Sequence, residues 1–228
     1  MTLHLYGFFV GLGIVAGIIV VEKINKKILT AELFSWIIIP AIFGARIYHV
    51  IDYWQYYQEN LWQILYLWQG GLAIYGSIIG GFIGLWFYSK LKKINIFAVC
   101  DVIAIGLPIG QAIGRLGNFF NKELYGLPTS LPWGIYINNK KYHPLFSYEA
   151  IWDILIFIVL IILIKTNKKR KTGFFFFSYL GLYSFGRFWL DFLRIDPWKI
   201  GTLAVSQYIS LIFLAISLYS ISYVPRKN

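Results

Sequence analysis

Cysteine, histidine and acidic residues are scarce in this chain, and the scarcity of cysteine and histidine excludes two kinds of site. Its 228 residues include one cysteine, three histidines and ten acidic residues. The lone Cys100 rules out an intramolecular disulfide framework. His4, His49 and His143 are too scattered to suggest a metal-ligand set. The Gly-x-Ser-x-Gly and His-Glu-x-x-His motifs are missing as well, which excludes the familiar hydrolytic arrangements.

Charge is also scarce, while apolar residues are abundant. Charged residues make up 14% of the chain and hydrophobic residues 58%, whereas soluble domains are roughly 25% charged. A soluble fold of this length could not bury so much apolar surface, so we expect lipid to surround most of the chain. The net charge of +11 does not indicate a nucleic-acid partner, because the cations cluster in short loops between apolar segments.

Seven stretches approach the length of about 20 apolar residues that a membrane-spanning helix needs. They are Leu5–Val21, Leu33–Ile51, Gly70–Ser89, Ile94–Asn118, Leu145–Ile164, Phe174–Phe192 and Leu203–Val224. The third is rich in glycine, which permits close helix packing or an interrupted, re-entrant entry. The pattern predicts an all-α polytopic membrane protein with about seven transmembrane helices in a single integral-membrane domain, residues 1–228. The longest connection, about 119–144, is expected to form a small extracytoplasmic cap.

Basic residues are distributed unequally between alternate loops. One set of loops holds thirteen: Lys23, Lys26, Lys27, Lys90, Lys92, Lys93, Lys165, Lys168, Lys169, Arg170, Lys171, Arg226 and Lys227. The opposite loops hold five: Lys122, Lys140, Lys141, Arg194 and Lys199. The positive-inside rule places the first set in the cytoplasm. Seven crossings then leave the N-terminus outside and the C-terminus in the cytoplasm.

Three arginines lie within apolar segments: Arg46, Arg115 and Arg187. By the orientation above, each is in the outward half of its segment. One such arginine could extend its charged end to the interface, but three on one leaflet favour a shared polar cavity. Buried cations repel one another unless anions accompany them. The candidate anions are Asp52, Glu123, Glu149, Asp153 and Asp191.

The sixth segment supports such a cavity. Tyr183, Arg187, Asp191 and Arg194 recur at helical spacing and therefore share one face. The Arg187–Asp191 pair could be purely structural, or the carboxylate could hold the arginine toward a ligand phosphate. A guanidinium suits phosphate because its planar fork of donors binds two oxygens and keeps its proton. This face therefore predicts a site for a phospholipid headgroup.

The stretch from Gly114 to Gly126, with the sequence GRLGNFFNKELYG, is the most specific motif in the chain. Arg115 and Asn118 are three residues apart and share a helical face. Asn121, Glu123 and Gly126 are expected just beyond the helix end. Asn118 could instead link helices, Glu123 could be a solvated loop carboxylate, and His143 could be a site residue or a cap.

This motif closely resembles the signature of the prolipoprotein diacylglyceryl transferase family, and further blocks match the family in order along nearly the whole chain. They are Tyr6-Gly7, Gly44-Ala45-Arg46, Trp68-Gln69-Gly70-Gly71 with Gly76, His143-Pro144, Tyr148-Glu149-Ala150, Tyr183, Arg187-Phe188, Arg194 and Gln207. The thirteen-residue signature is highly specific, whereas each other block would be weak alone.

The resemblance implies an activity and a set of site residues. It implies catalytic roles for Arg115, Arg187, Tyr75, Asn118 and Glu123, with both arginines binding phosphatidylglycerol. Substrate-binding roles follow for Tyr6, Arg46, Gly126, His143, Tyr183, Asp191 and Arg194. Two residues depart from the family pattern. Tyr75 stands where the family commonly has a histidine proposed as a base, so the proton acceptor is left open, and Asp191 replaces a glutamate.

The implied reaction moves the diacylglyceryl group of phosphatidylglycerol to the lipobox cysteine of a prolipoprotein signal peptide. A thioether forms and glycerol 1-phosphate leaves, the first step of bacterial lipoprotein maturation. Because the nucleophile belongs to the substrate, the reaction needs no metal and no cofactor. The expected location is the bacterial cytoplasmic (inner) membrane. Two alternatives remain at this stage. One is a small lipid or solute transporter. The other is an intramembrane lipoprotein-processing peptidase, with Asp52 and Asp153 as its catalytic carboxylates.

Overall fold

The structure is a computed structural model that describes residues 5–24, 30–166 and 171–223. Seven of the thirteen cations predicted to face the cytoplasm (Lys26, Lys27, Lys168, Lys169, Arg170, Arg226, Lys227) lie outside the described residues, as does Val224. The chain divides into two compact units, a larger one (residues 1–24 and 100–228) and a smaller one (residues 25–99). The single domain expected from the sequence stays a prediction.

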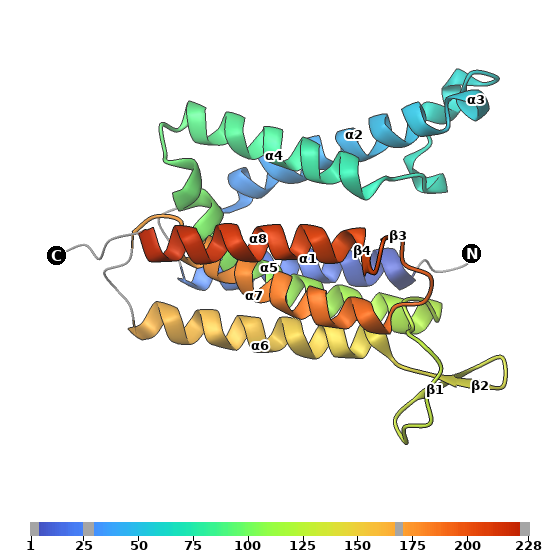
Figure 1. Cartoon of the computed structure of the whole chain (residues 1–228). Helices are drawn as coiled ribbons and strands as arrows, with labels where there is room; N and C mark the ends of the chain where they lie inside the picture. Colours follow the sequence, from blue (N-terminus) through green and yellow to red (C-terminus); the bar gives the residue numbers. More distant parts are fainter. Residues whose placement is uncertain (1–4, 25–29, 167–170, 224–228) are drawn as a thin grey trace. The chain divides into compact units, whose positions relative to one another are not determined.

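The smaller unit is built on two packed helices, α2 (Thr30–Asp52) and α4 (Ile74–Leu91). Figure 1 shows them side by side, joined through α3 (Trp54–Tyr57) and the short 3₁₀ helices η1 (Leu61–Leu65) and η2 (Leu67–Gln69). Gly76, Gly80 and Gly84 recur every four residues of α4, and a methyl group on any of them would collide with a backbone carbonyl of α2. Small residues at this spacing let membrane helices approach closely.

The glycines before α4 explain one difference from the prediction. Gly70 and Gly71 have φ values of +86° and +74°, which a right-handed helix excludes. The helix therefore begins at Ile74 rather than at residue 70. Of the two possibilities left open by the sequence, the structure shows close packing, and a re-entrant entry stays a prediction.

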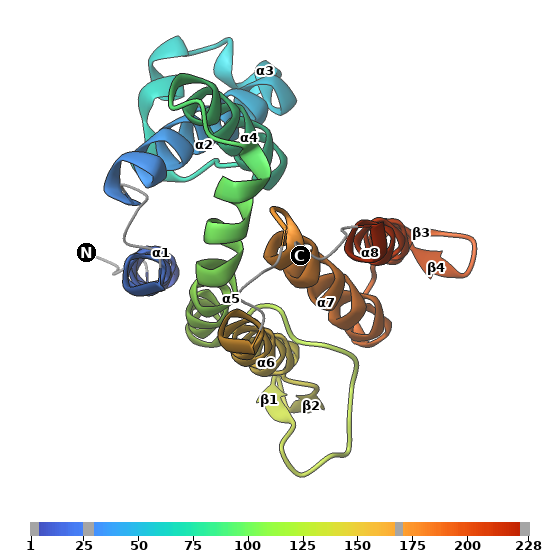
Figure 2. The same ribbon diagram turned by 90° about the vertical axis from the view of Figure 1, so that its left-hand side faces the viewer.

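In its described residues, the larger unit contains five long helices and two small hairpins. The helices are α1 (Leu5–Ile24), α5 (Ile96–Asn121, whose first residues belong to the smaller unit), α6 (Leu145–Thr166), α7 (Phe174–Leu190) and α8 (Val205–Tyr223). Figure 2 shows that they follow one another in this order across the unit. The 3₁₀ turn η3 (Asp191–Leu193) extends α7.

Glycines and a half-buried carboxylate hold these helices together. A side chain at Gly13 would come within 2.5 Å of the Gly110 carbonyl oxygen, so α1 and α5 pack through backbone. Asp101 of α5 accepts hydrogen bonds from the amides of Gly173 (2.6 Å) and Phe176 (2.8 Å). These amides belong to the first turn of α7, where a helix presents unpaired donors and favours negative charge.

Both hairpins lie at one end of the larger unit, together with the start of α6 and the end of α7 (Figure 1). One pairs β1 (Ile135–Ile137) with β2 (Lys140–Tyr142), and the other pairs β3 (Lys199–Ile200) with β4 (Leu203–Ala204), both antiparallel. The first hairpin belongs to the predicted cap. The cap was placed at about 119–144, but α5 continues to Asn121, so Asn121 is the last helical residue and not a residue beyond the helix.

Five described helices are long and apolar enough to cross a membrane: α1, α2 (from Ala31), α5, α6 and α8. The other two predicted segments form α4, with 18 residues, and α7, with 17. The all-α polytopic membrane fold is therefore confirmed, while the count by length and composition is five rather than seven. The sixth and seventh segments also start or end with short irregular elements, η3 and the β4 strand.

Candidate functional site

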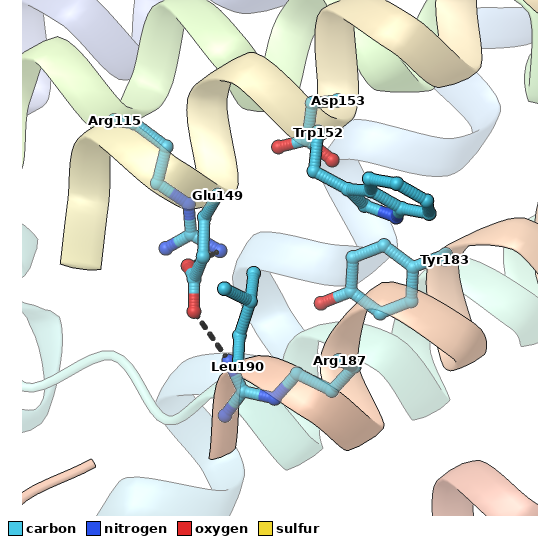
Figure 3. Close-up of a pocket in the computed structure, with 7 residues that line it drawn as sticks. All are labelled: Arg115, Glu149, Trp152, Asp153, Tyr183, Arg187 and Leu190. Carbon is cyan, nitrogen blue, oxygen red and sulfur yellow. Dashed lines mark hydrogen bonds and ion pairs between the residues drawn. The ribbon is translucent and has the colours of Figure 1, made fainter. Parts of the chain in front are cut away.

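Arg115 of α5 and Arg187 of α7 converge on one carboxylate, Glu149 of α6 (Figure 3). The Nη2 atom of Arg115 lies 2.6 Å from Oε2 of Glu149, and Nη1 of Arg187 lies 2.7 Å from Oε1. Glu149 is 5% exposed, so its charge is shielded from bulk water. Three helices from distant parts of the sequence thus meet at a single buried anion.

The ion pairs continue toward the end of α7. Arg187 also lies 3.1 Å from Asp191, and Asp191 lies 3.7 Å from Arg194. Charges therefore alternate along a chain of five residues, Arg115, Glu149, Arg187, Asp191 and Arg194. Burial lowers the pKa of Arg194, and the nearby Arg187 lowers it further, while Asp191 opposes the change. An arginine keeps its proton in proteins despite such shifts.

This chain of ion pairs, hereafter the charge chain, borders a narrow cavity. Its lining residues are Arg115, Glu149, Trp152, Asp153, Tyr183, Arg187 and Leu190. The two arginine side chains are 23% and 17% exposed, so both keep donors open to a ligand. Tyr183 comes one turn before Arg187 and faces the same space, as its helical spacing predicted.

An apolar groove adjoins this cavity and shares two of its walls, Trp152 and Leu190. The groove runs between α6 and α7 and is also lined by Tyr148, Ile151, Phe185, Gly186 and Trp189. Gly186 keeps the helices close, because a side chain there would collide with the Trp152 indole. That indole donates a hydrogen bond of 3.0 Å to the Leu182 carbonyl and so ties α6 to α7.

Asn118 and Glu123 form a second cluster where α5 ends. The Asn118 amide donates a hydrogen bond of 3.0 Å to the Glu123 carboxylate, and Asn121 donates one of 3.4 Å. Lys122 and Leu124 have positive φ values of 52° and 57°, which turn the chain sharply out of the helix. Asn118 is buried, and its contact shows how the signature motif fixes the turn that follows Arg115.

Gly126 and His143 connect the cap to the end of α7. The Gly126 amide donates to the His143 carbonyl (2.8 Å), and the Leu127 amide donates to the Leu193 carbonyl (2.8 Å). A side chain at Gly126 would approach the Leu193 carbonyl oxygen to 2.6 Å. The His143 ring contacts the Tyr148 hydroxyl at 3.1 Å. These contacts hold the backbone next to Arg194.

The remaining predicted residues have other surroundings. Tyr6 of α1 packs against Gly117, where an added side chain would come within 2.9 Å of the Tyr6 ring. Tyr75 is 63% exposed in α4 and its ring lies 6.1 Å from that of Tyr48. Tyr75 and Arg46 belong to the smaller unit.

Arg46 has a dense set of backbone partners. Its guanidinium donates to the carbonyls of Gln63, Ile64, Tyr66, Gly70 and Gly71. These contacts favour a structural role for Arg46, which holds the segment between α3 and α4 in place. Its predicted role in substrate binding stays a prediction.

Glu149, Asp153 and Trp152 were not among the predicted site residues. Both acids had been recognised as candidate anions, and their spacing of four places them on one face of α6. That spacing, inside an otherwise apolar helix next to the Tyr148-Glu149 block, was the available signal. Nothing in the sequence indicated which arginine each acid would meet.

Together these features define a class of protein: a polytopic membrane protein with paired arginines beside an apolar groove. The family model described as prolipoprotein diacylglyceryl transferase matches residues 1–223. The chain belongs to this family.

Individual relatives agree over nearly the full length. A protein of Clostridioides difficile is 41% identical over 228 residues, which cover 98% of this chain and 91% of the relative. One of Thermosynechococcus vestitus is 36% identical over 231 residues, covering 95% and 86%. One of a Nostoc species is 36% identical over 243 residues, covering 98% and 86%. All three carry the name phosphatidylglycerol–prolipoprotein diacylglyceryl transferase.

Proposed function

We propose that this chain transfers the diacylglyceryl group of phosphatidylglycerol to the lipobox cysteine of a prolipoprotein signal peptide. The observation that carries the proposal is the meeting of Arg115 and Arg187 on buried Glu149, beside an apolar groove. Membership of the family supports it, since relatives are named for this activity. None of the contacts described favours a transporter or a peptidase.

The donor geometry of the two arginines favours a phosphodiester as the ligand of the arginine cavity. The cavity is lined by two guanidinium groups, those of Arg115 and Arg187, and by two carboxylates, those of Glu149 and Asp153. A phosphatidylglycerol phosphate carries one negative charge. The forks of Arg115 and Arg187 can each bind two of its oxygens, while the groove between α6 and α7 is apolar and suits an acyl chain.

The arginines would act most strongly as the reaction proceeds. The substrate thiolate attacks the glycerol carbon, the carbon–oxygen bond breaks, and negative charge grows on the departing phosphate. Preorganised donors aimed at such growing charge are worth about 3 kcal/mol each. Glu149 and Asp191 then serve as positioning residues, because they fix the guanidinium groups before the lipid arrives.

The other predicted site residues have supporting roles in this proposal. Asn118, Glu123 and Gly126 shape the turn and the cap beside the cavity, and Tyr183 offers a hydroxyl to the lipid. Arg194 and His143 face the cap end, where the glycerol headgroup would lie. Tyr6 supports Gly117 from α1. These roles rest on the contacts described above and on the family resemblance.

We place the protein in the bacterial cytoplasmic membrane, with its N-terminus and the cap outside. The distribution of basic residues supports this orientation. The orientation also fits the substrates. A prolipoprotein presents its signal peptide from the membrane, and in this orientation the arginine cavity, at the cap end of the larger unit, lies toward the outer side.

Mass spectrometry of a lipobox peptide tests the activity. The purified protein is placed in vesicles that contain phosphatidylglycerol, and the peptide is expected to gain one diacylglyceryl group in thioether linkage. Vesicles of phosphatidylcholine alone, and a peptide with serine in place of the cysteine, are the controls. Uptake or flipping of lipid without a thioether product would favour the transporter instead.

Single cysteines test the orientation, because the native Cys100 is buried. Lys140 lies in the cap hairpin and Lys165 near the end of α6, and both are exposed. A membrane-impermeant thiol reagent should label Lys140→Cys in intact cells, and Lys165→Cys only after permeabilisation. The reverse pattern would show that the orientation is inverted.

A further inference from the structure

Asp153 is a second carboxylate on the face of α6 that carries Glu149, one turn farther along the helix. It is 2% exposed and lines the cavity with Arg115, Tyr183 and Arg187. Its Oδ2 atom is buried and has no hydrogen-bond partner among the described residues. Buried polar atoms normally have at least one partner. Figure 3 shows the carboxylate directed into the space that the arginines and the tyrosine surround.

The proposed reaction needs a group that accepts the proton of the substrate thiol. Among the cavity-lining side chains, the two arginines are permanently protonated, and the Trp152 indole is a donor only. Glu149 Oε1 accepts a hydrogen bond from Arg187, and Oε2 forms an ion pair with Arg115 without a hydrogen bond. The Tyr183 phenol would first have to lose its own proton, and a free phenol is less acidic than a thiol. Among the described cavity residues, Asp153 is the one whose carboxylate has a buried oxygen with neither a hydrogen bond nor an ion pair.

The depth of Asp153 also suits this task. The helix α6 starts at the cap, so Asp153 lies about 6 Å farther from the cap than Glu149, measured along the helix axis. In a membrane lipid, the glycerol carbons lie on the hydrocarbon side of the phosphate. A phosphate held at the level of Glu149 therefore places the reacting carbon, and a thiol that attacks it from behind, near the level of Asp153.

We propose that Asp153 is the catalytic residue that accepts the proton of the substrate cysteine, an inference that rests on the proposed function. The S–H bond breaks and its proton moves to the Asp153 carboxylate. The thiolate forms a bond to the glycerol carbon as the carbon–oxygen bond breaks and its electron pair remains with the phosphate. The leaving phosphate monoester then carries an extra negative charge. The proton on Asp153 passes to this phosphate or to water, which restores the carboxylate.

A selenocysteine peptide separates this role from a structural one. Selenols are more acidic than thiols and ionise at neutral pH without help from a base. With the cysteine peptide, Asp153→Asn should lower turnover roughly 100-fold, as expected for loss of a general base. With a selenocysteine peptide of the same sequence, the variant should come within a few-fold of the wild-type protein. Glu149→Gln is the matched comparison, because weaker positioning of the arginines should slow both peptides.

Two outcomes would refute the proposed role of Asp153, and a third would refute the proposed function on which it rests. Wild-type turnover of the cysteine peptide by Asp153→Asn would overturn the inference, and so would equal losses on both peptides. If the wild-type protein forms no thioether at all, the proposed function fails instead. The two failures are therefore distinguishable.

The wild-type protein supplies a second test in case Asp153→Asn does not fold. Activity on the cysteine peptide should fall at low pH as Asp153 becomes protonated, and the selenocysteine peptide should lack this step. The titratable groups that face Asp153 are Arg115 of α5, Glu149 of α6, and Tyr179, Tyr183 and Arg187 of α7. Glu149 serves both peptides, so its protonation would change both profiles equally. Identical profiles would overturn the inference.

Discussion

Replacement of Glu149 by glutamine tests whether one carboxylate organises the arginine cavity. The amide keeps the length and shape of the side chain but removes the charge that Arg115 and Arg187 share. In the wild-type protein the two carboxylate oxygens lie 2.6 Å and 2.7 Å from the guanidinium nitrogens. In the variant, the glutamine amide nitrogen is itself a donor, so it cannot accept a hydrogen bond from the arginine that it faces. Arg115 and Arg187 would then repel each other, because no shared negative charge lies between them.

The size of the effect follows from burial. Removal of one partner from a buried ion pair costs about 3–5 kcal/mol. Because the arginine side chains keep 23% and 17% exposure, water compensates part of this loss, and the lower figure of about 3 kcal/mol applies. If this energy is lost from the transition state, kcat/KM should fall about 100-fold.

Thioether formation in phosphatidylglycerol vesicles measures kcat/KM, and thermal unfolding in detergent shows whether the variant is folded. Glu59→Gln is the matched control, because Glu59 is exposed in the smaller unit and should keep wild-type activity. A folded Glu149→Gln protein with activity within about threefold of wild type would refute the reasoning.

Further changes test the neighbouring groups. Arg115→Lys and Arg187→Lys should each lower turnover at least about tenfold, because lysine lacks the planar fork; near-normal activity in both would contradict phosphate binding by a fork. Asp191→Asn should slow the reaction without altering membrane insertion, since Arg187 loses a positioning charge, and unchanged activity would make that pair incidental. Asp101→Asn should lower the unfolding free energy by about 1.5–3 kcal/mol, the typical worth of hydrogen bonds to a charged group, with normal activity per folded molecule. Tyr75→Phe should keep partial activity with an unchanged pH profile; a folded, lipid-binding but inactive variant would show that Tyr75 transfers the proton.

The helices could be predicted because the information for them is local. Long apolar runs interrupted by basic loops placed every segment, and the largest error in a starting residue came at Gly70 and Gly71. Glycine content alone does not tell whether a residue adopts positive φ, which depends on the turns that precede α4. The two short hairpins were also missed, since strands of two or three residues leave almost no periodic pattern.

The site could be predicted only where its contacts stay within one helix. Arg187 and Asp191 were paired correctly because a spacing of four brings them together. Glu149 meets Arg187 across 38 residues of sequence, and such a contact depends on how α6 and α7 pack. Like Arg115 and Arg187, Arg46 lies within an apolar segment of the sequence. Its partners are backbone carbonyls of a folded-back segment, which composition cannot reveal.

The alternation of charges in the charge chain restricts how this sequence can change during evolution. Each inner member compensates two neighbours. A substitution at Glu149 therefore removes the ion-pair partner of Arg115, and one at Asp191 removes that of Arg194. Arg187 keeps one of its two partners in either case. Effects at such coupled positions do not add, and a second change at a neighbouring arginine should therefore be milder in the altered background than in the original one. Residues of the charge chain should therefore change in pairs, an acid together with the arginine that it contacts. Single neutral substitutions should be confined to the lipid-facing sides of the same helices.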